Sequence, residues 1–195
     1  MKSRSGRLFL APISAAILAA LIGLAAAAFA AETEVRLERH PDATYEITGL
    51  FTVDASTTVV WGVLTDYERI PAFVSSMRSS RVREARADGT LVVEQRAVGG
   101  MFFLSKTLRT RLEVRRSPER LRFTDVGHED FRSYDGDWEV RPITAGAGVT
   151  YHLLVEPGFG APSFIMNRAM KRDARKLLDE VRAEIVRREL GGRPR

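Results

Sequence analysis

Side chains able to carry acid–base chemistry are sparse in this sequence. Tyr134, Asp135 and Tyr151 are the only mild candidates for a general acid–base pair inside a folded core. No histidine falls on a strand position that faces the interior, because His152 lies on the polar parity of its segment. The residues therefore favour a binding protein over an enzyme, and we assign no catalytic residue.

Thiol and metal chemistry have little support. The chain contains no cysteine, which excludes disulfides, thiolate nucleophiles and cysteine-type zinc sites. His128, Glu129 and Asp130 are adjacent, but three neighbours in a turn rarely converge on one ion. No second motif of the type His-x-His or His-x-x-x-His accompanies them. We expect a solvated turn at this place, no metal site and no cofactor.

Aromatic residues at alternating positions indicate a site for an apolar molecule instead. Tyr134, Trp138 and Val140 share one parity of an alternating segment and should face the interior. Gly136, on the same parity, leaves room for a ligand or for a neighbouring chain. Trp138 is interpreted either as a cavity wall or as ordinary core packing.

The segment Val98–Leu104 is apolar, although it is expected to form the tip of a hairpin. One interpretation is a lip at a cavity mouth that touches a membrane or the tail of a ligand. The other is a loop that folds back and seals the core. We favour the lip, and we expect transient membrane contact through Met101–Leu104.

Two further groups of side chains are weaker candidates. Met166 and Met170 stand near Phe164, and flexible thioethers suit a pocket that accepts varied apolar shapes. A methionine stripe also occurs in ordinary cores. Arg109 and Arg111 share one strand face and could orient an acidic head group, although arginine-rich exteriors are common.

The elements that must position these residues follow from periodicity and from the turn-like breaks. After a first strand over 45–53, a short amphipathic helix spans 57–64, and one more turn over 67–70 ends before Pro71. Short turn-like connections favour antiparallel neighbours. Six strands are expected over 81–86, 91–98, 103–114, 120–126, 131–141 and 148–156.

The longest helix is expected over 163–190. Its apolar positions recur at helical spacing, and the opposite face is charged. Only this helix is long enough to cover one face of a seven-stranded antiparallel sheet, and a curved sheet around it tends to leave a cavity. The apolar stripe consists of Met166, Met170, Ala174, Leu177, Val181 and Ile185.

The first 30 residues have the pattern of a secretory signal. Lys2, Arg4 and Arg7 precede an uncharged stretch over 8–27, and Ala28-Phe29-Ala30 provides a cleavage site. We expect cleavage after about Ala30 and export to the periplasm, with a retained N-terminal membrane anchor as the alternative. The expected organisation is a signal peptide over 1–30, a loose lead-in over 31–44, a ligand-binding domain over 45–190 and a flexible tail over 191–195.

The overall charge does not indicate a nucleic-acid partner. Three of the 30 basic residues and none of the 25 acidic residues lie in the leader, which leaves a net charge of +2. Arginines are spread through every segment and mixed with acidic residues, whereas nucleic-acid binding needs a dense basic face.

Four segments, which together span about residues 45–188, carry a resemblance to a known family. They are Val53-Asp54-Ala55-Ser56 followed by 60–67, Asp130–Tyr134 followed by Gly136-Asp137-Trp138, 148–151 with Glu156-Pro157, and the terminal helix with Leu177-Leu178. These segments resemble the START-like (SRPBCC) superfamily, in particular its polyketide-cyclase and coenzyme Q-binding branch. The resemblance implies an α+β helix-grip fold, which by itself says little about the ligand.

These observations predict a seven-stranded curved antiparallel sheet, two short helices after the first strand and a long C-terminal helix across the sheet, enclosing a hydrophobic cavity. We expect an exported binder or carrier of a hydrophobic small molecule or lipid, such as a quinone or isoprenoid. The alternatives are a polyketide-cyclase/dehydratase-like enzyme using the same cavity and, third, an envelope adaptor that binds protein partners. The expected cavity residues are Phe51, Tyr67, Phe73, Met101, Phe103, Tyr134, Trp138, Val140, Tyr151, Leu153, Phe164, Met166 and Met170.

Overall fold

The computed structural model describes residues 32–101, 104–160 and 162–192, and the predicted leader lies outside them. The described residues form eight strands, three α-helices and one 3-10 turn. The strands are β1 (Glu34–Arg39), β2 (Tyr45–Val53), β3 (Met77–Ala85), β4 (Leu91–Met101), β5 (Leu104–Arg116), β6 (Arg120–Asp125), β7 (Phe131–Ile143) and β8 (Gly146–Pro157). The helical elements are α2 (Thr57–Leu64), the 3-10 turn η1 (Tyr67–Arg69), α3 (Ile70–Phe73) and α4 (Ser163–Gly192).

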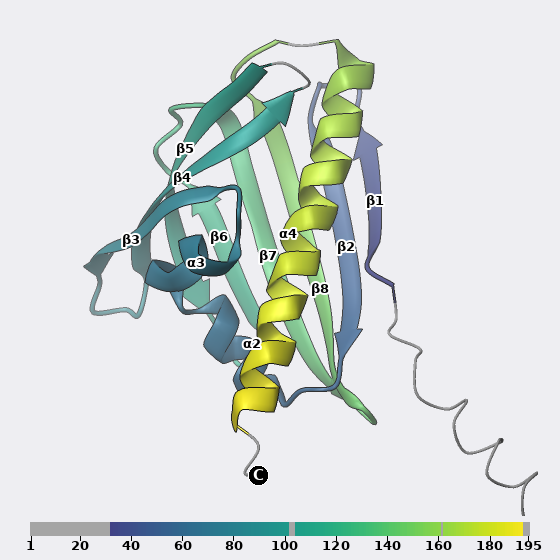
Figure 1. The fold of residues 1–195 in the computed structure, drawn as a ribbon. Helices are drawn as coiled ribbons and strands as arrows, with labels where there is room; N and C mark the ends of the chain where they lie inside the picture. Colours follow the sequence, from purple (N-terminus) through teal and green to yellow (C-terminus); the bar gives the residue numbers. More distant parts are fainter. Residues whose placement is uncertain (1–31, 102–103, 161, 193–195) are drawn as a thin grey trace, which may run out of the picture. The chain divides into compact units, whose positions relative to one another are not determined.

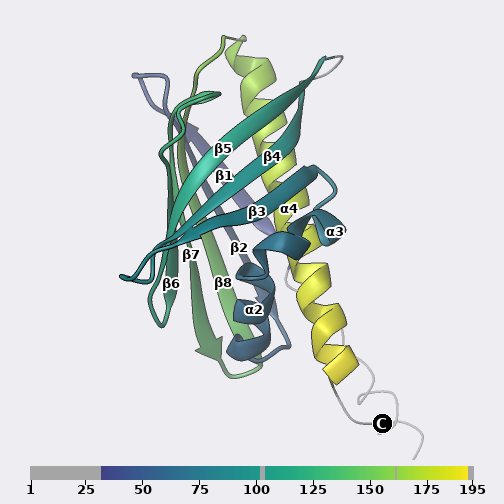
Figure 2. The same ribbon diagram turned by 90° about the vertical axis from the view of Figure 1, so that its left-hand side faces the viewer.

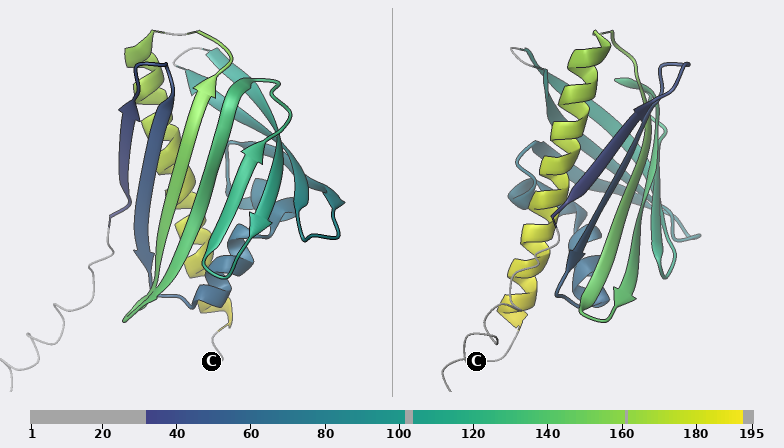
Figure 3. Two further views of the ribbon diagram at one scale, coloured as in Figure 1. Left: turned by 180° about the vertical axis from the view of Figure 1, so that it is seen from behind. Right: turned by 90° about the vertical axis from the view of Figure 1, so that its right-hand side faces the viewer.

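All eight strands belong to one antiparallel sheet in the order β1-β2-β8-β7-β6-β5-β4-β3. The sheet curves around α4, which crosses its concave face (Figure 1). In the side view, β3, β4 and β5 bend over toward α4 (Figure 2). Seen from behind, the outer face of the sheet carries no described helix (Figure 3). The α+β helix-grip architecture expected from the sequence is therefore confirmed.

The strand count predicted from the sequence was wrong, because the lead-in contains β1. Val35 is buried and Leu37 is half-buried, while the residues between and around them are polar. This short edge strand pairs antiparallel with β2 along its whole length. Its turn contains no glycine: Ala43 adopts a φ of 69°, and the Asp42 carboxylate accepts a hydrogen bond from the backbone N–H of Thr44 at 3.0 Å.

The helix predicted to end before Pro71 continues instead as α3. Pro71 occupies the first turn of α3, where its missing N–H would have no intrahelical partner in any case. The 3-10 turn η1 joins directly to this helix at Ile70. The segment therefore provides a longer wall beside the sheet than the sequence pattern predicted.

Helix α4 packs on the sheet through the apolar stripe predicted for it. Val181 and Ile185 of this stripe are buried, whereas Met170 and Leu177 remain half-buried. Leu178, which the predicted stripe did not include, is also buried. The helix approaches β2 closely at Gly49, where a Cβ atom would collide with the side chain of Leu178. Among the described residues, no helix is both long and apolar enough to span a membrane.

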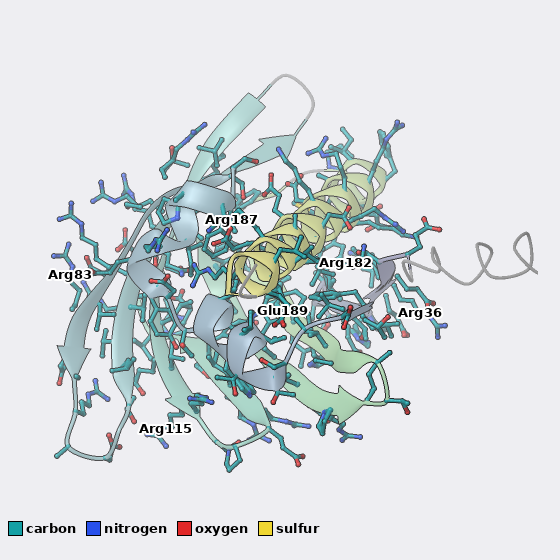
Figure 4. All side chains as sticks on the ribbon, turned by 60° about the horizontal axis from the view of Figure 1, so that its bottom comes forward. Arg36, Arg83, Arg115, Arg182, Arg187 and Glu189 are labelled. Atoms are coloured by element: carbon teal, nitrogen blue, oxygen red, sulfur yellow. The ribbon has the colours of Figure 1, made fainter. Side chains whose placement is uncertain are left out.

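Polar contacts tie the second half of α4 to α2 and η1. Arg188 donates to the carbonyl of Gly62 at 3.0 Å and to the carboxylate of Asp66 at 2.9 Å. Glu189 accepts a hydrogen bond from the backbone N–H of Ser56, at the start of α2, at 3.3 Å (Figure 4). These contacts fix α2 and η1 against the end of α4 and so hold one wall of the space beneath it.

Candidate ligand cavity

Two adjoining apolar spaces lie between the concave face of the sheet and α4. The lower lobe, beside α2, η1 and α3, encloses about 120 Å³. The upper lobe, beside β4, β5 and the first half of α4, encloses about 210 Å³. Five residues line both lobes and form the waist between them: Val74, Met77, Tyr134, Tyr151 and Leu177.

The lower lobe is walled by the helical segment that follows β2. Tyr67, Ile70 and Phe73 face it from η1 and α3, and Trp138 faces it from β7. Gln95 is the one amide in its lining, and its side chain donates to the hydroxyl of Ser80 at 3.2 Å. The described lining is otherwise apolar except for the tyrosine hydroxyls and the indole N–H of Trp138.

Besides the tyrosine hydroxyls of the waist, the upper lobe carries its few polar side chains at Ser76, Lys106 and Asp173. The ammonium of Lys106 lies 2.9 Å from the carboxylate of Asp130 and 3.9 Å from the ring centroid of Phe159. Although desolvation acts to raise the pKa of Asp130, hydrogen bonds from Lys106 and from the backbone of Arg109 lower it. The charge of Lys106 is thus balanced within the protein.

A cluster of aromatic rings from β6, β7 and β8 forms the floor of the cavity. The ring centroids of Phe131 and Tyr134 are 4.9 Å apart, and those of Trp138 and Tyr151 are 4.6 Å apart. Phe123 joins the two pairs, at 5.8 Å from Tyr134 and 6.3 Å from Tyr151. Such a floor offers broad, polarisable contact area to an apolar molecule.

The two tyrosines of the waist stay protonated at neutral pH. Desolvation raises the pKa of Tyr134, and it raises that of Tyr151 well above the usual value. The two hydroxyl groups lie close enough together for each to act on the pKa of the other. A phenol with a raised pKa donates hydrogen bonds readily but is a poor base near neutral pH. The waist therefore supplies a hydrogen-bond donor rather than an acid–base pair.

Eight of the residues expected at the cavity line the two lobes. The helical stripe and the strand parities place them there, with ring and thioether groups directed inward. Tyr67, Phe73 and Trp138 lie at the lower lobe, Leu153, Met166 and Met170 at the upper lobe, and Tyr134 and Tyr151 at the waist.

The structure places other expected cavity residues elsewhere. Phe51 and Val140 are buried on either side of Val149, in a part of the sheet covered by packed side chains and outside both lobes. Phe164 is 70% exposed, because it precedes the inward residue Met166 by two positions and so falls on the opposite side of α4. The side chains of Met101 and Phe103 lie outside the described residues.

The arginines considered for head-group binding lie on the outer face. Arg111 pairs with Glu94 at 3.2 Å, and Arg109 pairs with Glu129 at 3.4 Å. Neighbouring Arg83, which also pairs with Glu94, projects on the side away from α4 (Figure 4). Strand parity explains the placement, since Leu108 and Leu112 face inward. Arg109 and Arg111 therefore do not reach either lobe.

Asp135 also faces away from the cavity, because it alternates with the inward-facing Tyr134 on β7. Of the three acid–base candidates, only Tyr134 and Tyr151 are therefore among the described lining residues.

Several residues that line the cavity were not selected from the sequence. Phe123 and Leu121 share the buried parity of β6, and this alternation was the signal that could have found them. Met77 and Leu177 complete the waist, and Phe159 follows β8. Leu177 already belonged to the stripe of α4, but a stripe does not tell which members touch the sheet and which face a space.

A model of the family described as "Polyketide cyclase / dehydrase and lipid transport" matches residues 42–186. The chain belongs to this family. The match covers the sheet from the turn of the first hairpin onward, without β1, and most of α4, and so includes both lobes of the cavity. No curated protein sequence matches the chain.

Solved structures share the fold of this family member at low sequence identity. The protein TTHA0849 from Thermus thermophilus is 21% identical with a TM-score of 0.64, over 73% of this chain and 98% of that one. The Zhui aromatase/cyclase from Streptomyces sp. R1128 is 15% identical with a TM-score of 0.61, over 74% and 95%. The STAR-related lipid transfer protein from Xanthomonas axonopodis is 16% identical with a TM-score of 0.58, over 77% and 98%.

Proposed function

We propose that this protein is an exported binder or carrier that holds a hydrophobic small molecule or lipid, such as a quinone or isoprenoid, between the sheet and α4. The observation that carries the proposal is the apolar cavity itself, with its aromatic floor and its flexible methionine side chains from α4. A lined, mostly apolar cavity with a few placed polar groups is sufficient for binding.

A polyketide-cyclase/dehydratase-like enzyme is the second candidate, favoured by the phenols that face the cavity and by a family that includes such enzymes. Proton transfer needs a group that accepts a proton near neutral pH. The raised pKa values of Tyr134 and Tyr151 argue against either phenol as that base. Binding without chemistry is the function that the described cavity supports best.

Export and membrane contact complete the proposal. The leader pattern over 1–30 supports export to the periplasm, with an uncleaved anchor as the alternative. The apolar sequence Met101–Leu104, the expected hairpin tip, contains the last residue of β4 and the first residue of β5, whereas Phe102 and Phe103 lie outside the described residues. We propose that this tip touches membranes transiently during delivery. Replacing Phe102 with Ser should then slow transfer to liposomes while leaving affinity in solution unchanged.

Organic extraction of the protein purified from the periplasm, followed by mass spectrometry, tests the central proposal. We expect one class of apolar molecule to be enriched in near-stoichiometric amount over a periplasmic protein without a cavity that is purified in parallel. Turnover of a bound polyketide-like compound would favour the enzyme. Extracts without enrichment, together with no binding of added apolar probes, would leave the protein-binding adaptor as the better account.

A further inference from the structure

The waist of the cavity holds a hydroxyl proton that the protein itself does not use. Tyr134 on β7 and Tyr151 on β8 stand on opposite sides of the Gly136–Leu153 pair, both line the waist, and each hydroxyl acts on the pKa of the other. Two hydroxyl groups carry two protons, and a hydrogen bond between them would use only one. In the described part of the chain, neither phenol has any other hydrogen-bond partner.

Burial points to Tyr134 as the phenol whose O–H is presented to the cavity. Tyr151 is only 3% exposed and packs against Trp138. Tyr134 is half-buried and lines both lobes, so its accessible surface faces the cavity. Its free O–H is therefore available at the junction of the two lobes.

Going beyond the proposed function, on which it rests, we propose that Tyr134 donates a hydrogen bond to a neutral acceptor oxygen, such as a carbonyl, placed partway along an elongated apolar ligand. The two apolar ends of that ligand would occupy the upper and lower lobes. A buried O–H group without an acceptor is unfavourable. The waist therefore favours ligands whose acceptor oxygen lies beside Tyr134.

The surroundings of the waist disfavour an anionic group in the same place. The buried carboxylate of Asp125 accepts backbone hydrogen bonds from Arg111, Gly127 and His128, and its charge acts to raise the pKa of Tyr134. A negative ligand group beside Tyr134 would meet the same repulsion. Lys106, the cationic residue of the described lining, is already paired with Asp130 at 2.9 Å. The ligand class is thus a neutral carbonyl compound rather than a fatty acid.

Four probes of equal chain length test this inference: a ketone with its carbonyl at mid-chain, the methyl ketone, the parent alkane and the fatty acid. Each displaces the apolar dye N-phenylnaphthylamine from the purified full-length protein. We expect the mid-chain ketone to bind about 2- to 10-fold more tightly than the alkane, the range of one net hydrogen bond. Tyr134→Phe should abolish this preference, so that the mid-chain ketone and the alkane bind with equal affinity. Tyr67→Phe, at another phenol of the lining, should retain it.

The outcomes separate this inference from the proposed function. Equal affinities for the alkane and the mid-chain ketone in the parent protein would overturn the inference while leaving the carrier intact. Retention of the preference in Tyr134→Phe, or a fatty acid that binds as tightly as the ketone, would also overturn it. Failure of the dye and of all four probes to bind would contradict the proposed function itself.

Discussion

The ring of Phe123 on β6 rests directly on Gly136 of β7: a Cβ atom on Gly136 would lie 2.5 Å from Cζ of Phe123. The two residues are partners in the antiparallel register of β6 and β7. The space left open by Gly136 is therefore filled by a ring of the cavity floor, and the missing side chain is what lets the aromatic cluster close.

Replacing Gly136 with Ala should disrupt this contact. The added methyl group would collide with Phe123 and with the backbone of His152, and overpacking of this kind costs about 1–3 kcal/mol of unfolding free energy. Gly148→Ala on β8 is the matched control, since the nearest atom to its new Cβ would be Ile143 Cγ2 at 3.6 Å, an ordinary contact. Urea denaturation of both variants measures the difference. Equal midpoints would show that Phe123 does not depend on Gly136.

The inward face of α4 can be tested by a buried charge. Val181 is 4% exposed and lines the lower lobe, so Val181→Asp should cost about 3 kcal/mol or more because the carboxylate would have no partner there. Lys176→Ala, on the exposed side of the same helix, should change stability by about 0.5 kcal/mol or less. Melting temperatures that fall by the same amount in both variants would contradict this assignment of faces.

Glu184 makes stability depend on acid pH. Hydrogen bonds from Arg187 and Arg188 lower the pKa of Glu184 from 4.5 to about 2, although desolvation acts against them. A folded-state pKa below the unfolded one stabilises the protein above pH 4.5, and this contribution is lost as pH falls toward 2. Glu184→Gln should cost about 1–3 kcal/mol at neutral pH, with the difference from the parent shrinking across that window. A difference that does not change with pH would contradict the ion-pair account.

Arg188 should control the rate of ligand exchange through the wall of the lower lobe. Its guanidinium joins α4 to Gly62 and Asp66, next to the segment that carries Tyr67. Arg188→Ala should loosen η1 and α3 and speed both association and dissociation of an apolar dye, with little change in affinity. Arg187→Ala is the control, because Arg187 donates its hydrogen bonds to Glu184 within α4 and to no described residue of the lower-lobe wall. Stopped-flow traces that are identical for the two variants would exclude this wall as the entry route.

The sequence predicted the architecture well where a regular apolar pattern extended over many residues. The alternation in β2 and the stripe of α4 located the two layers, since burial on one face imposes those periods. It missed β1, because a six-residue edge strand needs only Val35 and Leu37 to face inward and its other positions are polar. It ended a helix too early at Pro71, because proline is harmless in the first turn of α3.

The candidate site was less predictable, because a cavity forms where inward-facing side chains of the sheet and of α4 do not contact each other. Phe51 and Tyr134 share the same kind of strand position, yet only Tyr134 faces a lobe, whereas Phe51 is enclosed by packed side chains. Phe164 was expected at the cavity because it stands near Met166 and Met170 in the sequence, but its angle around the helix directs it to the other side. Residue parity tells which face a side chain is on, whereas the distance between the two layers is set by tertiary packing.

The most direct measurement of the central claim is dye binding after the upper lobe has been filled from within. Met170 is half-buried and lines that lobe, so Met170→Trp should place a large ring in the space without adding charge. Arg172→Trp puts the same side chain on the exposed face two positions later. With both variants folded by circular dichroism, N-phenylnaphthylamine should bind Arg172→Trp like the parent and bind Met170→Trp at least about 10-fold more weakly, as expected for a blocked pocket. Equal affinity of the two variants for the dye would contradict the claim that this cavity is where the protein holds its ligand.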